Sequence, residues 1–77
     1  MANVETIVAI VRAEVERATG LHGPMRSRHE GYAVLLEEVD ELWDEVKKRN
    51  PDPVALRKEA TQVAAMAIRF VLDVCHG

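Results

Sequence analysis

The sequence predicts a single all-α domain spanning residues 1–77. Apolar residues recur three and four positions apart in three segments, and no segment alternates apolar and polar residues as a strand would. Glycine and proline residues separate these segments. A chain of this length buries only about 60% of its unfolded surface, so its own core is thin. We therefore expect three helices, with the second and third long and antiparallel, that assemble into an oligomeric helical bundle.

The first helix is expected to begin after Asn3, because asparagine is a good N-cap residue. Its apolar positions follow helical spacing: Val4, Ile7, Val8, Val11 and Val15. Gly20 is expected to end this helix. The segment "GLHGPMRS" that starts there holds two glycines and a proline, which is typical of a loop.

The second helix is expected to follow a capping box formed by Ser27 and Glu30. The basic run 47–49 is expected to lie in its last turn, where cations suit the helix dipole, and Asn50-Pro51 stops it. One side of this helix carries an apolar stripe that is expected to pack in the core, Trp43 included. Its members are Tyr32, Leu35, Leu36, Val39, Leu42, Trp43 and Val46.

The third helix is expected to start with Asp52 as its cap and Pro53 at its first position, and to run to about Val74. It is apolar on nearly all sides. One face centres on Val63, and the opposite face carries Ala65, Ile68 and Leu72. Three helices can cover only one of these faces, so we expect a homodimer or homotetramer in which a second subunit covers the other.

Composition excludes several function classes. The net charge is −3 and no basic stripe is interleaved with aromatic residues, so nucleic acid is not an expected partner. The apolar runs are too short to cross a bilayer, and no membrane partner is expected. The single cysteine, Cys75, and the lack of an export signal predict a cytoplasmic protein. The three histidines show no spacing that would predict a histidine metal site.

Acidic residues are crowded on the second helix, where six of the nine residues from 37 to 45 are Asp or Glu. One interpretation is a solvated polar face. The third helix favours another, because Glu59 falls inside its apolar arc, where a buried carboxylate needs a metal or a partner such as Arg28 or Arg57. The alternative is that the arc is incomplete and leaves Glu59 in water. Glu38 and Glu41 are one turn apart on the facing helix. Three converging carboxylates predict an all-oxygen site for Mg²⁺, with Mn²⁺ as the alternative ion.

The motifs "EEVDEL" (37–42) and "KEATQV" (58–63) resemble those of the MazG-type all-α nucleoside triphosphate pyrophosphohydrolases. That family has EExxE on one helix and ExxD on the next. The resemblance implies Mg²⁺ as cofactor, a (d)NTP as substrate, and (d)NMP and pyrophosphate as products. It assigns the metal to Glu37, Glu38, Glu41, Glu59 and Gln62, with Glu38 and Glu41 catalytic. Gln62 stands where the family has Asp, which removes one negative charge.

Arg26, Arg28 and His29 are candidate contacts for the triphosphate, because they lie just before a helix N-terminus, where backbone N–H groups attract anions. The alternative interpretation is a solvated basic loop. For the whole chain, the alternative to an enzyme is a non-catalytic MazG-like helical module that has lost a metal ligand. Such a module would bind a nucleotide or act only in oligomerisation.

Overall fold

The computed structural model describes residues 2–76, and this part of the chain is helical without any strand. It contains the α-helices α1 (Val4–His22), α2 (Arg28–Val46) and α3 (Pro53–Phe70), followed by a short π-helix, η1 (Val71–Cys75). The predicted all-α fold with three main helices is confirmed. No helix in this range is long and apolar enough to cross a membrane.

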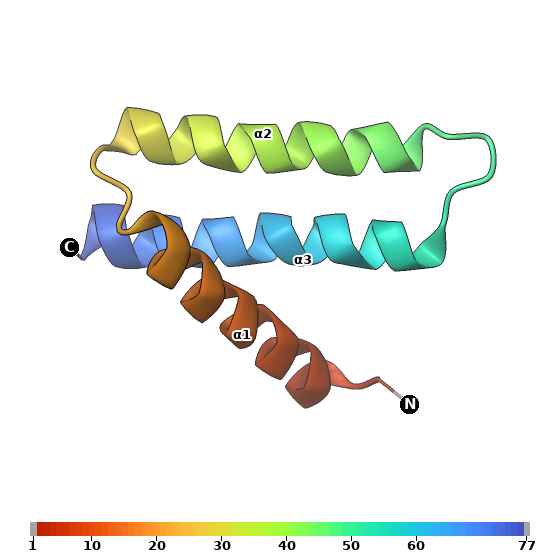
Figure 1. The fold of residues 1–77 in the computed structure, drawn as a ribbon, viewed down its shortest axis with the longest axis horizontal. Helices are drawn as coiled ribbons and strands as arrows, with labels where there is room; N and C mark the ends of the chain where they lie inside the picture. The colour runs from red at the N-terminus through yellow and green to blue at the C-terminus, as the bar shows by residue number, and fades with distance from the viewer. Residues whose placement is uncertain (1, 77) are drawn as a thin grey trace.

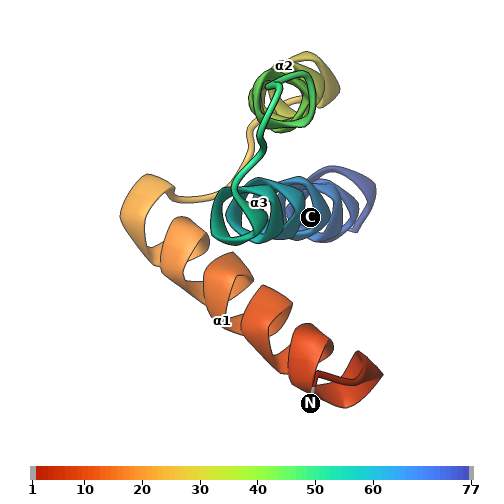
Figure 2. The same ribbon diagram turned by 90° about the vertical axis from the view of Figure 1, so that its right-hand side faces the viewer.

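Helix α3 is the central element of the fold. Figure 1 shows it leaving the loop that follows α2 and returning alongside α2. Seen along these two helices, α3 lies between α2 and α1, and α1 crosses it obliquely so that the N-terminal end of α1 points away (Figure 2). Both outer helices therefore pack mainly against α3.

The three predicted N-caps are all present. The Asn3 side chain accepts a hydrogen bond from the Thr6 N–H at 2.9 Å, and the Ser27 hydroxyl accepts one from the Glu30 N–H at 3.0 Å. Asp52 accepts one from the Val54 N–H at 2.9 Å, and Pro53 is the first residue of α3 as expected. Each cap satisfies a backbone donor that the first turn of a helix leaves without a partner.

The predicted end of the first helix was wrong. Helix α1 continues through Gly20 and ends at His22, because Gly23, with φ of 72°, is the residue that turns into the left-handed region. The Gly23 N–H still donates to the Thr19 carbonyl at 2.9 Å, and Pro24 follows, which a helix cannot easily accommodate.

The predicted end of the second helix was also wrong. Helix α2 stops at Val46, so residues 47–49 lie beyond its last turn. Lys47 and Lys48 instead pair with acids of the last turn, Lys47 with Asp44 at 3.1 Å and Lys48 with Glu45 at 2.6 Å.

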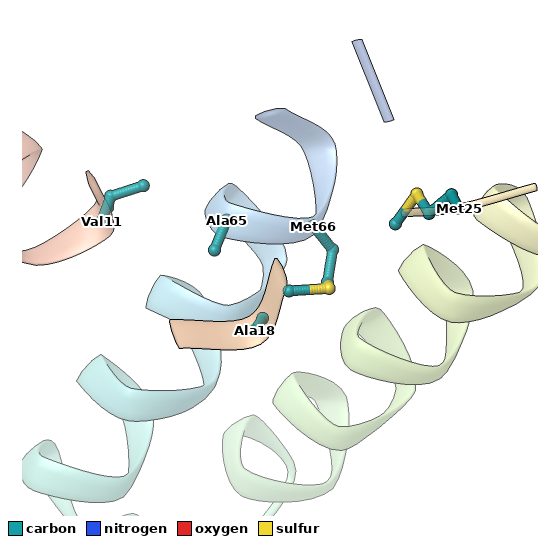
Figure 3. Close-up of a cluster of buried hydrophobic side chains, with 5 residues drawn as sticks. All are labelled: Val11, Ala18, Met25, Ala65 and Met66. Atoms are coloured by element: carbon teal, nitrogen blue, oxygen red, sulfur yellow. The ribbon is translucent and has the colours of Figure 1, made fainter. Parts of the chain in front are cut away.

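The buried core lies where α1 and the 23–27 loop meet α3 (Figure 3). Its members are Val11, Ala18, Met25, Ala65 and Met66. Ala65 has no exposed surface, so the expectation that a second subunit covers this residue was wrong: α1 covers it within the chain. Ile68 and Leu72 remain exposed, and together with Ile7 and Val8 they line an apolar groove of about 580 Å³.

Most residues of the α2 apolar stripe face solvent in the single chain, so the prediction that this stripe packs in the core was wrong for them. Trp43 is 58% exposed, and most other members of the stripe are exposed as well: Tyr32, Leu36, Val39 and Val46. The face turned toward α3 is the neighbouring one, which carries Gly31, Val34, Leu35, Glu38, Leu42 and Glu45. Gly31 permits this close packing, because a Cβ there would lie 2.7 Å from the Phe70 ring.

Candidate metal centre and adjoining cleft

Three predicted site residues come together between α2 and α3. Glu38, Glu41 and Glu59 each offer a carboxylate oxygen, and these oxygens all lie within 4.8 Å of one another. Glu38 and Glu41 are one helical turn apart and so share a side of α2. Glu59 meets them from α3. The predicted convergence of the three side chains is therefore observed, while metal binding stays a prediction.

The cluster strongly disfavours full ionisation. Burial raises the pKa of Glu38 to about 7, with further contributions from Glu41, Glu59 and Glu37. Burial also raises the pKa of Glu59, and the charge of Glu41 adds to this while Lys58 opposes it. Carboxylates that share a site repel one another, which adds to the effect of burial on Glu38 and Glu59.

The donor set fits a hard divalent cation. All three side chains offer oxygen, which Mg²⁺ and Mn²⁺ prefer. The Oε2 atom of Glu38 is buried and has no hydrogen-bond partner among the described residues, so it is an acceptor without a donor. Within residues 2–76, Glu59 makes no ion pair with Arg28 or Arg57, so the ion-pair alternative is not observed.

Sequence reasoning missed a fourth carboxylate, Glu45, at the edge of the cluster. Its Oε1 atom is buried without a hydrogen-bond partner within the described chain, while its Oε2 binds Lys48 at 2.6 Å. Its charge also helps to raise the pKa of Glu59. The sequence did contain a signal for Glu45, because Glu38, Glu41 and Glu45 follow the spacing i, i+3, i+7 of one helix face.

A polar cleft of about 440 Å³ adjoins the cluster and reaches from α2 to α1. Glu37 and Glu38 line it on the α2 side, so the predicted ligand Glu37 faces the cleft while lying outside the three-carboxylate group. The cleft also collects four basic side chains from separate parts of the chain: Arg17, His22, Arg26 and Arg69.

The three predicted substrate contacts, Arg26, Arg28 and His29, all line one hollow at the start of α2, and only Arg26 also lines the cleft. Arg26 lines the cleft, where its Nε lies 3.5 Å from a carboxylate oxygen of Glu30. Arg28 and His29 share that hollow with Arg26 and Asp73 and are not part of the cleft lining. Sequence reasoning did not identify Arg17 and His22 as residues of the cleft. Nothing in the sequence of α1 indicated that the end of this helix would line a cleft together with the 23–27 loop.

Gln62 lies on the α1 side of the cleft. Arg17 chiefly holds the pKa of the Glu14 carboxyl below its ordinary value, and a hydrogen bond from Gln62 lowers it further. Arg17 and Glu14 form an ion pair at 2.6 Å. Gln62 thus has a neighbour on α1, and its predicted role as a metal ligand stays untested.

Comparisons of the chain with protein-family models, curated proteins and solved structures returned no match. The resemblance to the MazG-type pyrophosphohydrolases therefore rests on the two short motifs and stays a prediction.

Proposed function

We propose that this chain is a cytoplasmic, Mg²⁺-dependent nucleotide pyrophosphohydrolase that converts a (d)NTP to a (d)NMP and pyrophosphate. The observation that carries the proposal is the convergence of Glu38, Glu41 and Glu59 across two helices, beside a cleft lined with arginines. A solvated acidic face would not need Glu59 to meet the acids of α2. The resemblance of the two motifs supplies the reaction class.

The residues of the chain have distinct proposed roles. When bound, Mg²⁺ would neutralise negative charge on the phosphates and lower the pKa of a water molecule that it binds. The ion would be held by Glu38, Glu41 and Glu59. The resemblance to the family motifs adds Glu37 and Gln62 as further candidate ligands. Glu41, which is exposed and belongs to the cluster, would accept a proton from water. Arg17 and Arg26 would neutralise phosphate oxygens in the cleft.

The test is pyrophosphate release from a panel of (d)NTPs with Mg²⁺ or Mn²⁺, comparing the wild type with Glu59→Gln. We expect turnover only with metal, and at least a hundredfold loss in the variant. Saturating metal should also raise the melting temperature of the wild type and not of Glu59→Gln, because the ion binds only the folded site. Asp40→Asn, on the exposed side of α2, is the matched control and should keep both properties.

The second candidate is a non-catalytic MazG-like module that binds a nucleotide or serves in oligomerisation. The position of Gln62 favours it, because this residue brings no charge to the site and interacts with Glu14 of α1. Nucleotide binding without turnover of any (d)NTP, under both metals, would support this candidate over the enzyme.

We also propose that the chain forms a homodimer or homotetramer. The exposed members of the α2 stripe, at 32, 36, 39, 43 and 46, alternate spacings of four and three, which is the seam pattern of paired helices. A second copy of the chain presents the same seam and the same apolar groove between α1 and α3. Trp43→Glu should therefore give monomers in sedimentation at micromolar protein. A wild type that already sediments as a monomer would contradict this assembly.

A further inference from the structure

Arg69 is the one charged residue that is buried within residues 2–76, with 3% of its surface exposed. No carboxylate of this range lies within 4.0 Å of its guanidinium nitrogens. Burying a cation without a counter-charge is costly, and buried arginines are normally paired. Within residues 2–76, the positive charge of Arg69 therefore has no acidic partner.

The hydrogen bonds of Arg69 leave part of its donor capacity unused. One terminal nitrogen donates to the Gly23 carbonyl at 2.5 Å, and the other lies 3.5 Å from the Met66 sulfur, a weak acceptor. The Nε atom is buried and has no partner among the described residues. Asp73, one turn further on, accepts a hydrogen bond from the Met25 N–H at 2.9 Å and does not pair with Arg69.

Arg69 lines the polar cleft, where it meets the basic side chains of Arg17, His22 and Arg26. The acids of this cleft are Glu30, Glu37 and Glu38. Glu30 pairs with Arg26, and Arg17 pairs with Glu14, but both arginines are largely exposed and can turn toward a ligand. Three arginines thus line the same cleft as Glu38 of the candidate metal centre.

We propose that this cleft binds a phosphate-chain oxyanion, with Arg69 as the buried contact and Arg17 and Arg26 as the exposed ones. A guanidinium group matches the oxygens of a phosphate with paired N–H donors, and an anion would supply the missing counter-charge. The inference deepens the proposed function and rests on it for the identity of the ligand as the phosphate end of a nucleotide. The binding of the anion itself does not depend on metal.

The probe is sodium pyrophosphate, added in EDTA at constant ionic strength, with sodium chloride as the control salt. Titration calorimetry should show binding to the wild type, and saturating pyrophosphate should raise the melting temperature by roughly 5 °C or more. Arg69→Met keeps much of the side-chain volume and should bind at least about tenfold more weakly. Arg49→Gln, on the exposed segment after α2 and outside the cleft, should bind like the wild type.

A readout in the wild type does not depend on whether Arg69→Met folds. In ¹H–¹⁵N spectra, the Nε–H resonance of Arg69 should move as pyrophosphate is added, because this buried donor gains a partner. The inference is overturned if that resonance does not move, or if folded Arg69→Met binds pyrophosphate as tightly as the wild type. Arg69 would then have only a structural role, through its hydrogen bond to the Gly23 carbonyl.

The two proposals fail separately. Glu59→Gln should keep the metal-free binding of pyrophosphate while losing metal-dependent turnover. Turnover in the wild type without pyrophosphate binding would overturn the proposed role of Arg69 and would leave the proposed enzymatic function unaffected. Pyrophosphate binding through Arg69 without turnover of any (d)NTP would retain the anion site and remove the enzymatic function.

Discussion

Glu38→Gln should make the metal-free protein more stable at pH 8. The folded state raises the pKa of Glu38 from 4.5 to about 7, chiefly through burial and next through the charge of Glu41. An acid whose pKa is raised on folding is protonated more readily in the folded state. Its protonated form contributes full stability below pH 4.5, and this contribution is lost as pH rises from 4.5 through 7.

The structure sets the size of the effect. Each pKa unit corresponds to about 1.4 kcal/mol, so the shift of Glu38 has an upper bound of about 3.5 kcal/mol in free energy of unfolding. Water reaches part of this side chain and screens its neighbours, so we expect about 1 kcal/mol. In a domain of this size, that corresponds to a melting temperature about 4–8 °C higher for Glu38→Gln at pH 8.

Urea denaturation in EDTA at pH 4, 5, 6, 7 and 8 provides the assay, with Asp40→Asn as the matched control. The difference between Glu38→Gln and the wild type should grow across the window from pH 4.5 to 7 and then level off. Subtracting the two proteins removes only the part of the Glu59 contribution that does not depend on the charge of Glu38, because the two carboxyl groups interact. A constant difference across this range, or a variant less stable than the wild type at pH 8, would refute the reasoning.

Three further substitutions test the packing around the site. Gly31→Ala places a Cβ 2.7 Å from the Phe70 ring and should lower the free energy of unfolding by roughly 1 kcal/mol in urea, since the clash outweighs the gain in helix propensity. Gly23→Ala should cost about 1 kcal/mol in the same assay, because φ is 72° there; an unchanged midpoint would disprove the strain. Gln62→Asp puts a carboxylate beside Glu14 and should lower the melting temperature more at pH 7 than at pH 4.

The sequence by itself determined the local features of this fold. The caps at Asn3, Ser27 and Asp52 are confirmed because each depends on a hydrogen bond to a residue two or three positions away. The presence of three helices follows from apolar spacing within each segment. The meeting of Glu38 and Glu41 with Glu59 was also foreseeable, because a short loop returns the chain along the helix that precedes it.

Only the tertiary structure decided how each helix is rotated about its axis. Periodicity marks the apolar side of α2, yet it cannot say which side meets a neighbour. In the fold, Gly31 packs against Phe70, Glu38 and Glu45 are partly buried, and Trp43 is exposed. Burial of Arg69 was equally hidden, because it depends on α1 and the Gly23 loop closing over α3 from distant parts of the chain. Such contacts join residues far apart in sequence, and no local pattern encodes them.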